Sequence, residues 1–341
     1  MTDPLVETVL QEYGARTREA IRAFLPSGEP RRYLYDLLED YPSRRGKMMR
    51  SSLCIAAARA CGGRLEDALP TAVSIELLHN AQLVHDDIED DSDERRGTPT
   101  LHALHGIPLA LNAGDAMGLL SVKPLFENFS RLGVATSLRL LQETERVAWQ
   151  SAEGQALELG WQRDNRTDLD DADYFRMVMQ KTCWLGTIHP LRAGCLVGSR
   201  GRMSLDPLIR VGFLFGAAFQ IQDDILNLEP GPEYGKEVNG DLVEGKRTLM
   251  VIHALRQLPA GDRRRLVQLL GMPRTRRVDA RVQELRALLE RTGAIDYARA
   301  VAGALAGAAL REFDQFFATR PASRDRDFLR ATLLWVLQRS H

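Results

Sequence analysis

The sequence contains only four cysteines, Cys54, Cys61, Cys183 and Cys195, and no two of them form a C-x-x-C pair. A chain of 341 residues can bury a large hydrophobic core, so its fold does not depend on disulfides. The seven histidines are scattered without the spacing of a zinc finger. We therefore expect free thiols and a protein of the reducing cytoplasm.

Long hydrophobic runs and an excess of charge are also absent. No stretch approaches the roughly 20 consecutive apolar residues of a membrane-spanning helix, and residues 1–14 do not have the pattern of a signal peptide. The formal net charge of -1 argues against a nucleic-acid partner bound through a broad basic face. Residues 263–277 are basic and loop-like, and we interpret them as solvated surface.

Strand-like alternation and fixed-period repeats are missing, whereas apolar residues recur at helical steps of three and four through most of the chain. Turns that contain glycine or proline separate the periodic segments. The length allows one large domain or two ordinary ones, and the pattern predicts an all-α helix bundle in which residues 211–225 lie centrally. The clearest predicted helices are 71–91, 174–185, 205–228, 278–289 and 325–337.

An acidic cluster ends the predicted helix 71–91. Asp86 and Asp90 are four residues apart, so their carboxylates share one helix face, and Asp87 flanks them. Unpaired like charges at this spacing destabilise a helix by roughly 0.2–0.5 kcal/mol per pair. The helix macrodipole also disfavours anions at a C-terminal end. A bound divalent cation would reverse both penalties.

A second acidic cluster ends the predicted helix 205–228, where Asp223, Asp224 and Asn227 repeat the spacing of oxygen ligands. Either cluster alone could be a solvated helix end. Two clusters that each adjoin an apolar stretch favour a common site near the core. Carboxylates that face each other across a cavity can hold Mg²⁺ with a diphosphate between them, because Mg²⁺ combines few carboxylates with water and phosphate oxygens.

Several motifs in order resemble the trans-isoprenyl diphosphate synthases. Residues 79–102 contain a DDxxD motif followed by RRG, residues 219–227 resemble the family's second aspartate-rich motif, and residues 245–248 read GKRT. The resemblance implies a single-domain all-α bundle of the isoprenoid synthase type around a central active-site cavity. It implies one polyprenyl synthetase domain over 1–341, with a motif-bearing core at about 46–250 and C-terminal helices at 251–341.

The same resemblance assigns basic residues to two diphosphates. Lys47 and Arg50 are three residues apart and would share a helix face. The family's equivalents of Lys47, Arg50, His79 and Arg96 bind isopentenyl diphosphate without metal. Arg95, Lys181, Lys236 and Lys246 would bind the allylic diphosphate.

The resemblance implies ionisation of an allylic diphosphate, condensation with isopentenyl diphosphate and loss of a proton. About three Mg²⁺ ions would be bound at each site, with Asn227 as a weaker ligand than the usual aspartate. The metal ligands would be Asp86, Asp87, Asp90, Asp223, Asp224 and Asn227. Lys181, Thr182, Gln220 and Lys246 would be catalytic, with the carbonyl dipole of Gln220 stabilising the cation. A homodimer is also implied.

Product length is expected to depend on the helix that carries Asp86. One helical turn rises about 5.4 Å, roughly one extended five-carbon unit. Ala81 and Gln82 lie about one turn before Asp86, and the small Ala81 leaves space where an aromatic residue would stop growth. We predict a twenty-carbon product, geranylgeranyl diphosphate, with Leu78 in the floor of the pocket. Trp184 would either shorten the pocket or belong to the core.

Other interpretations remain open. A farnesyl or longer-chain synthase would use the same motifs, whereas a class I terpene cyclase would have no second diphosphate for Lys47 and Arg50. A ferritin-like di-iron protein would use an E-x-x-H element such as Glu76 to His79, but needs a second one that we do not find. A non-catalytic subunit would typically lack intact aspartate clusters.

Overall fold

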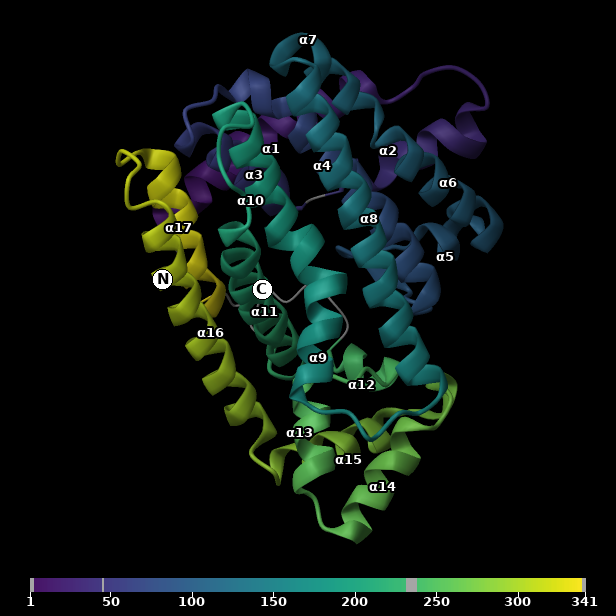
Figure 1. The fold of residues 1–341 in the computed structure, drawn as a ribbon. Coiled ribbons are helices and arrows are strands. Elements are labelled where there is room, and N and C mark those ends of the chain that lie inside the picture. Colours follow the sequence, from purple (N-terminus) through teal and green to yellow (C-terminus); the bar gives the residue numbers. More distant parts are fainter. Residues whose placement is uncertain (1–2, 45, 231–237, 339–341) are drawn as a thin grey trace.

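Helices make up nearly all of the computed structural model, which describes residues 3–44, 46–230 and 238–338 (Figure 1). The predicted all-α class is confirmed, and no helix in these ranges is long and apolar enough to cross a membrane. The first elements are α1 (Pro4–Phe24), η1 (Arg31–Tyr35), α2 (Asp36–Ser43), α3 (Met49–Ala60), α4 (Leu65–Glu89), β1 (Glu94–Arg95), β2 (Thr98–Pro99), α5 (Leu101–His105), α6 (Ile107–Leu120), η2 (Lys123–Glu127) and α7 (Asn128–Leu132). They are followed by α8 (Val134–Arg163), α9 (Asp171–Val178), η3 (Met179–Ile188), α10 (His189–Ser199), α11 (Pro207–Leu228), α12 (Gly240–Glu244), α13 (Leu249–Gln257), α14 (Ala260–Leu270), η4 (Arg274–Arg276), α15 (Asp279–Glu290), α16 (Ala294–Phe316) and α17 (Arg324–Gln338).

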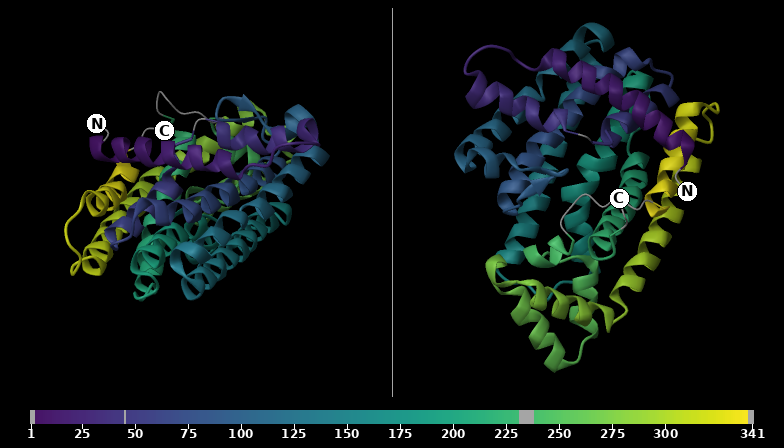
Figure 2. Two further views of the ribbon diagram at one scale, coloured as in Figure 1. Left: turned by 90° about the horizontal axis from the view of Figure 1, so that it is seen from above. Right: turned by 180° about the vertical axis from the view of Figure 1, so that it is seen from behind.

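The long helices run lengthwise side by side, with α16 along one edge and α8 toward the other (Figure 1). α11 packs against both α16 and η3, and α4 packs against α3 and α6. The shorter helices α13, α14 and α15 gather at one end, whereas α1 lies across the opposite end (Figure 2). The predicted central position of residues 211–225 is confirmed, since Val211, Phe215 and Ile221 are all buried.

Glycine allows α11 to approach η3 closely. A Cβ atom on Gly212 would lie 2.7 Å from Ile188 Cα, and one on Gly216 would lie 2.6 Å from Thr187 Oγ1. Side chains at these positions would push the two helices apart. The close contact fixes the next turn of α11, which carries Gln220, beside the start of η3.

The predicted helix 174–185 is helical throughout, but only residues 174–178 belong to the α-helix α9. From Met179 to Ile188 the chain forms a π-helix, in which each N–H bonds five residues back instead of four. Gly154 of α8 lies directly against this segment, since a Cβ there would be 2.1 Å from the backbone nitrogen of Lys181. Such wide turns occur frequently at functional sites.

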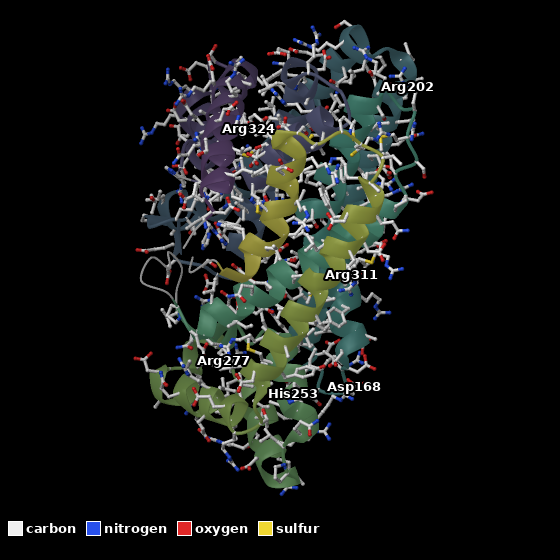
Figure 3. The ribbon with its side chains drawn as sticks, turned by 90° about the vertical axis from the view of Figure 1, so that its left-hand side faces the viewer. Asp168, Arg202, His253, Arg277, Arg311 and Arg324 are labelled. Carbon is white, nitrogen blue, oxygen red and sulfur yellow. The ribbon has the colours of Figure 1, made fainter. Side chains whose placement is uncertain are left out.

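The C-terminal helix is tied to the N-terminal part of the chain. Asp325 of α17 accepts a hydrogen bond from the hydroxyl of Tyr13 in α1 and one of 2.9 Å from Arg59 Nε in α3. The outer surfaces of α16 and α17 carry polar side chains, among them Arg311 and Arg324 (Figure 3). On their inner faces, α16 contributes Phe313 and α17 contributes Phe328 to the core.

Candidate active site

The two carboxylates at the end of α4 each meet a lysine from a distant segment. Lys181 Nζ lies 3.3 Å from Asp86 Oδ1, and Lys246 Nζ lies 2.9 Å from Asp90 Oδ2. Lys181 also forms an ion pair with Glu158 of α8. α4 ends at Glu89, as the acidic motif predicted, so these cations also offset the negative end of the helix dipole.

The electrostatic environment favours ionised Asp86. Burial alone would raise the pKa of this carboxyl, but the charges of Lys181, Lys246 and Arg95 outweigh burial and lower its pKa. Burial has the larger effect at Asp90, whose pKa is raised. Both lysines keep a raised pKa despite their burial, because carboxylates surround them.

Asp87 is fully buried and holds other side chains in position. It accepts a hydrogen bond from the hydroxyl of Tyr41 and two from the guanidinium of Arg95. Arg95 Nη2 lies 3.9 Å from Asp86 Oδ2 as well, so the guanidinium faces the acidic helix end. Asp87 therefore positions Arg95 in this structure, and its predicted part as a metal ligand stays a prediction.

A hydrogen-bonded chain runs through the second acidic cluster. Thr182 Oγ1 donates to Gln220 Oε1 over 2.9 Å, and Gln220 Nε2 donates to Asp224 Oδ1 over 2.7 Å. The hydroxyl of Tyr174 donates to the other oxygen of Asp224 over 2.9 Å. Burial and the nearby Asp241 raise the pKa of Asp224 well above its usual value. These contacts fix the orientation of the Gln220 amide.

Lys246 connects the two acidic clusters. Besides Asp90, its ammonium lies 3.8 Å from Asp241 Oδ1 and 2.5 Å from Glu244 Oε2. The backbone N–H of Asp241 donates to Asn227 Oδ1 over 3.1 Å, so the amide of Asn227 anchors the turn that carries Asp241. The ends of α4 and α11 are thus joined through one lysine and the short helix α12.

Positive side chains crowd around His79 on α4. The charges of Arg50, Arg96 and Arg95 all act on the imidazole, and together with burial, the larger cause, they hold the pKa of His79 well below its usual value. Burial, with the nearby Arg96, likewise lowers the pKa of Arg50. Among the described residues, Arg50 Nε is buried without a hydrogen-bond partner. Buried like charges with an unpaired donor form a site for an anion.

Glu76 is the carboxylate beside this cationic cluster. Its Oε1 accepts hydrogen bonds from the backbone N–H of Ser51, at 3.0 Å, and from the Ser51 hydroxyl, at 2.9 Å, so it anchors the start of α3. Its charge also acts on Arg50 and Arg96. The three arginines around His79 oppose a bound cation, so Glu76 and His79 are not arranged to hold iron.

The donors around Asp86 and Asp90 suit Mg²⁺. No three carboxylate, imidazole or thiol groups of the described residues converge as a ready-made metal cage. Mg²⁺ does not require one, because it takes one or two carboxylates and completes its octahedron with water and phosphate oxygens. Both carboxylates already attract cations, in the form of the ammonium groups of Lys181 and Lys246.

Two predicted diphosphate ligands need comment. Lys47 does not share a helix face with Arg50, because α3 begins only at Met49 and Met48 has a left-handed backbone with φ of 50°. The Lys47 ammonium lies instead 5.0 Å from the ring centre of Trp335. Lys236 lies outside the described residues. Asp223 is close enough to Arg50 for its charge to act on the guanidinium.

The predicted chain-length residues point in different directions on α4. At about 100° per residue, Gln82 is about 40° from Asp86 around the helix, Leu78 about 80° and Ala81 about 140°. Leu78 packs in the same apolar cluster as Trp184. Trp184 is buried, which agrees with the predicted core position of this residue. Ala81 packs in the cluster that faces α6, and Gln82 is half-buried.

Some residues of the site were missed by sequence reasoning. Our interpretation of 263–277 as loop-like solvated surface is wrong for 263–270, which belong to α14 and bury Leu266, Leu269 and Leu270. It is also wrong for Arg274, whose Nη1 donates to the backbone oxygen of Asp90 over 2.8 Å and lies 3.5 Å from Glu244 Oε1. An arginine-rich loop carries no local sign of such a distant partner. Glu158, Asp241 and Tyr174 were also missed, because nothing in their sequence neighbourhoods marks them.

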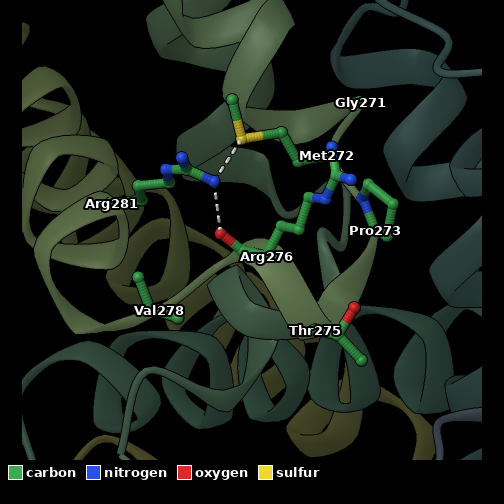
Figure 4. A pocket seen from close by; sticks show the side chains of 7 residues that line it. All are labelled: Gly271, Met272, Pro273, Thr275, Arg276, Val278 and Arg281. Carbon is green, nitrogen blue, oxygen red and sulfur yellow. Dashed lines mark hydrogen bonds between the residues drawn. The ribbon is translucent and has the colours of Figure 1, made fainter.

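A surface hollow of about 540 Å³ lies near η4, on the segment that carries Arg274 (Figure 4). Arg281 crosses it, with Nη1 donating to the backbone oxygen of Arg276 over 2.7 Å. Its lining residues include no carboxylate, so we do not assign the chemistry to it. They are Gly271, Met272, Pro273, Thr275, Arg276, Val278 and Arg281.

The chain is similar to known proteins over almost its whole length. The polyprenyl synthetase family model matches residues 31–289. A short chain isoprenyl diphosphate synthase of Methanothermobacter thermautotrophicus is 34% identical over 87% of this chain and 88% of that protein. A geranylfarnesyl diphosphate synthase of Natronomonas pharaonis is 30% identical over 98% of both chains. The crystal structure of a geranylgeranyl pyrophosphate synthetase from Pyrococcus horikoshii has a TM-score of 0.86 at 29% identity and covers 98% of each chain. The chain therefore belongs to the polyprenyl synthetase family of prenyltransferases.

Proposed function

We propose that this enzyme condenses isopentenyl diphosphate with an allylic diphosphate and releases a longer allylic diphosphate. The observation that supports this most directly is the presence of two different centres that can each bind a diphosphate. One consists of carboxylates with lysines around Asp86 and Asp90, and the other consists of the arginines around His79. A reaction between two diphosphate esters needs one centre for each.

The allylic diphosphate is bound at the acidic centre, where Asp86, Asp90 and Asp223 would hold Mg²⁺. When bound, Mg²⁺ draws electron density from the diphosphate and so makes it a better leaving group. Lys181, Lys246 and Arg95 move from their carboxylate partners toward the diphosphate oxygens. Their fixed charges stabilise the negative charge that develops as the carbon–oxygen bond breaks.

Gln220 faces the carbocation that this step leaves. Thr182 and Asp224 hold its amide in one orientation, so a carbonyl dipole is available near the reacting carbons without a nucleophile that would capture them. The double bond of isopentenyl diphosphate attacks the cation while Arg50, Arg96 and His79 hold the second diphosphate. The apolar surroundings exclude water, which would quench the cation. The released diphosphate takes the proton.

The product we propose is geranylgeranyl diphosphate, with twenty carbons, made from dimethylallyl, geranyl or farnesyl diphosphate. Leu78 and the buried Trp184 belong to the same apolar cluster, which supports a floor at the depth of Leu78. The related protein of Pyrococcus horikoshii carries the same product in its name. The relative of Natronomonas pharaonis is named for a product one unit longer, so twenty-five carbons is the alternative.

The purified full chain tests the proposal directly. We expect labelled isopentenyl diphosphate to enter a twenty-carbon product when an allylic diphosphate and Mg²⁺ are present, and no product when Mg²⁺ is chelated. A terpene cyclase would instead release hydrocarbon from one allylic diphosphate alone. A non-catalytic subunit would show no turnover without a partner. Either result would overturn the proposal.

We also propose that the enzyme is a homodimer joined through α5, α6 and α8. Most of the large apolar side chains that the described residues expose lie on this stretch, which forms the side of the molecule opposite α16 (Figure 1). Exposed apolar side chains concentrated on one stretch favour an interaction site, and a two-fold pair of identical chains would cover them. They are Leu104, Ile107, Leu111, Leu119, Phe126, Val134, Leu138 and Trp149.

Light scattering tests the dimer. We expect twice the mass of one chain, and a monomer for Ile107→Glu combined with Leu111→Glu, while Leu334→Glu on α17 serves as an exposed apolar control. A monomeric wild type would overturn this proposal without affecting the proposed reaction. We further propose that residues 1–341 act as one domain, which the contacts of Asp325 with Tyr13 and Arg59 support. We place the enzyme in the cytoplasm, in keeping with its four free, buried cysteines.

A further inference from the structure

Two buried cysteines face each other where α3 packs against α10. Cys61 follows the last residue of α3, Cys195 lies within α10, and their sulfur atoms are 3.1 Å apart although 134 positions separate them in the sequence. The two helix backbones touch here, because a Cβ on Gly198 would lie only 2.1 Å from the backbone oxygen of Ala58. This rigid crossing keeps the two sulfur atoms together.

The two thiols are chemically unequal. Cys61 adjoins the exposed Gly62, where a Cβ atom would meet no other atom within 4 Å. The Cys61 side is therefore open to solvent. Cys61 itself is 6% exposed, whereas Cys195 is fully buried. The hydrogen bond with Cys195, helped by the charge of Arg320, lowers the pKa of Cys61 despite its burial. The same hydrogen bond and burial raise the pKa of Cys195. An oxidant would therefore meet the more reactive thiol first.

We propose that Cys61 and Cys195 form a reversible disulfide when the protein meets a peroxide. The Cys61 thiolate attacks one peroxide oxygen, the oxygen–oxygen bond breaks, and hydroxide leaves, so that Cys61 becomes a sulfenic acid. Cys195 then attacks the Cys61 sulfur, and the sulfenic oxygen leaves as water with the proton of the Cys195 thiol. Two thiols are oxidised by two electrons in total, one peroxide is reduced, and two waters form.

The bond would join α3, which carries Arg50, to α10, which continues directly from η3 and its Lys181. A disulfide requires the sulfur atoms to approach to about 2.05 Å, a movement of about 1 Å from their present separation of 3.1 Å. Closure of so long a loop restricts the unfolded chain, so the midpoint of thermal unfolding should rise by about 5 °C or more.

Thiol counting and peptide mapping of the full-length protein test the proposal. After treatment with hydrogen peroxide and unfolding in an alkylating reagent, we expect the free thiols to fall from four to two. A crosslinked pair of peptides should contain Cys61 and Cys195, and dithiothreitol should restore all four thiols. Cys61→Ser and Cys195→Ser should abolish the crosslink. Cys54→Ser and Cys183→Ser, at other buried cysteines, should still lose two thiols.

Several results would overturn the proposal. They are four free thiols after peroxide, a crosslink that involves Cys54 or a second molecule, and oxidation of Cys61 that never proceeds to a disulfide. If the serine variants fold poorly, Cys61→Ala and Cys195→Ala replace them, and the peptide map of the wild type decides by itself.

Discussion

Lys246 donates a hydrogen bond of 2.9 Å to Asp90, although 156 positions separate the two residues. Glu244 and Asp241 lie near the same ammonium. Burial lowers the pKa of Lys246, but these carboxylates outweigh burial and raise the pKa well above its usual value. The lysine therefore keeps its charge at neutral pH, and it holds the ends of α4 and α11 in one charge network.

Replacing Lys246 should separate its effect on stability from its effect on catalysis. In Lys246→Met, Asp90 and Glu244 lose their buried cation, so we expect a loss of about 3 kcal/mol in the free energy of unfolding. Added Mg²⁺ should restore more stability to this variant than to the wild type. We expect kcat to fall about 100-fold or more, since one positive charge that stabilises the departing diphosphate is lost.

Urea unfolding with and without Mg²⁺ and steady-state kinetics check these effects. Lys123→Met, on the exposed surface of η2, is the matched control and should change neither measurement. A variant with reduced kcat whose stability is unchanged and insensitive to Mg²⁺ would contradict the charge network.

The arginines around His79 predict a conflict between stability and substrate binding. Arg50→Met removes a buried guanidinium whose Nε has no partner among the described residues. Burial and the like charge of Arg96 together outweigh the attraction of Glu76 and lower the pKa of Arg50, so we expect the protein without substrate to gain about 1 kcal/mol of stability. KM for isopentenyl diphosphate should rise about 100-fold, since a charged hydrogen bond to substrate is lost.

Differential scanning calorimetry and initial rates measure the two effects. Arg311→Met, on the exposed face of α16, should leave both unchanged. The anion site would be in doubt if Arg50→Met raised KM for the allylic diphosphate alone.

Product length should respond to residues on two faces of α4. Leu78→Ala opens space in the apolar cluster that also contains Trp184, so we expect a shift toward twenty-five carbons. Ala81→Phe places a ring on the face toward α6, and we expect fifteen carbons. Chromatography of the dephosphorylated products measures both. A change in the first variant with none in the second would place the hydrocarbon between α4 and η3 and would refute the predicted part of Ala81.

His189 makes stability depend on pH away from the active site. Burial is the main cause that lowers the pKa of this histidine to about 4 in the folded protein. Glu143 opposes this shift, and Arg192 adds to it. Between the ordinary value near 6.5 and this value, only the unfolded chain binds the proton. Stability is therefore complete above about pH 6.5 and falls as the pH drops toward 4, by roughly 3 kcal/mol.

Urea unfolding at pH 7 and at pH 4 checks this dependence. His189→Gln should lose less stability across the interval than the wild type does. His105→Gln, at an exposed histidine, should behave like the wild type. Equal losses in wild type and His189→Gln would show that other groups cause the acid sensitivity.

The sequence predicted the site best where the signal is local. Asp86 and Asp90 are four residues apart on a helix, so their common face follows from geometry alone. Arg50 and His79 needed the family resemblance, because a single arginine or histidine on an apolar helix has many explanations. The all-α class followed from uninterrupted periodicity.

Three features could not be predicted, each for a physical reason. Residues 183–188 are buried without a break, so their apolar pattern does not distinguish a π-helix from an α-helix, and η3 was not predicted. Lys47 was placed on a helix, but the left-handed backbone of Met48 delays the start of α3. Arg274 binds the backbone of Asp90, 184 positions away, and nothing near it in the sequence reveals that partner.

The wide turns of η3 contain more residues than an α-helix would need to cover the same path. If one residue between Met179 and Ile188 were deleted, the segment could continue as a regular helix from α9 into α10, but the two ends would rotate against each other by about 100°. Either Lys181 would turn away from Asp86 or Ile188 would leave the core. The register of this single segment therefore couples the placement of a charged group to the packing of the bundle, and a one-residue deletion here could abolish activity in a protein that still folds.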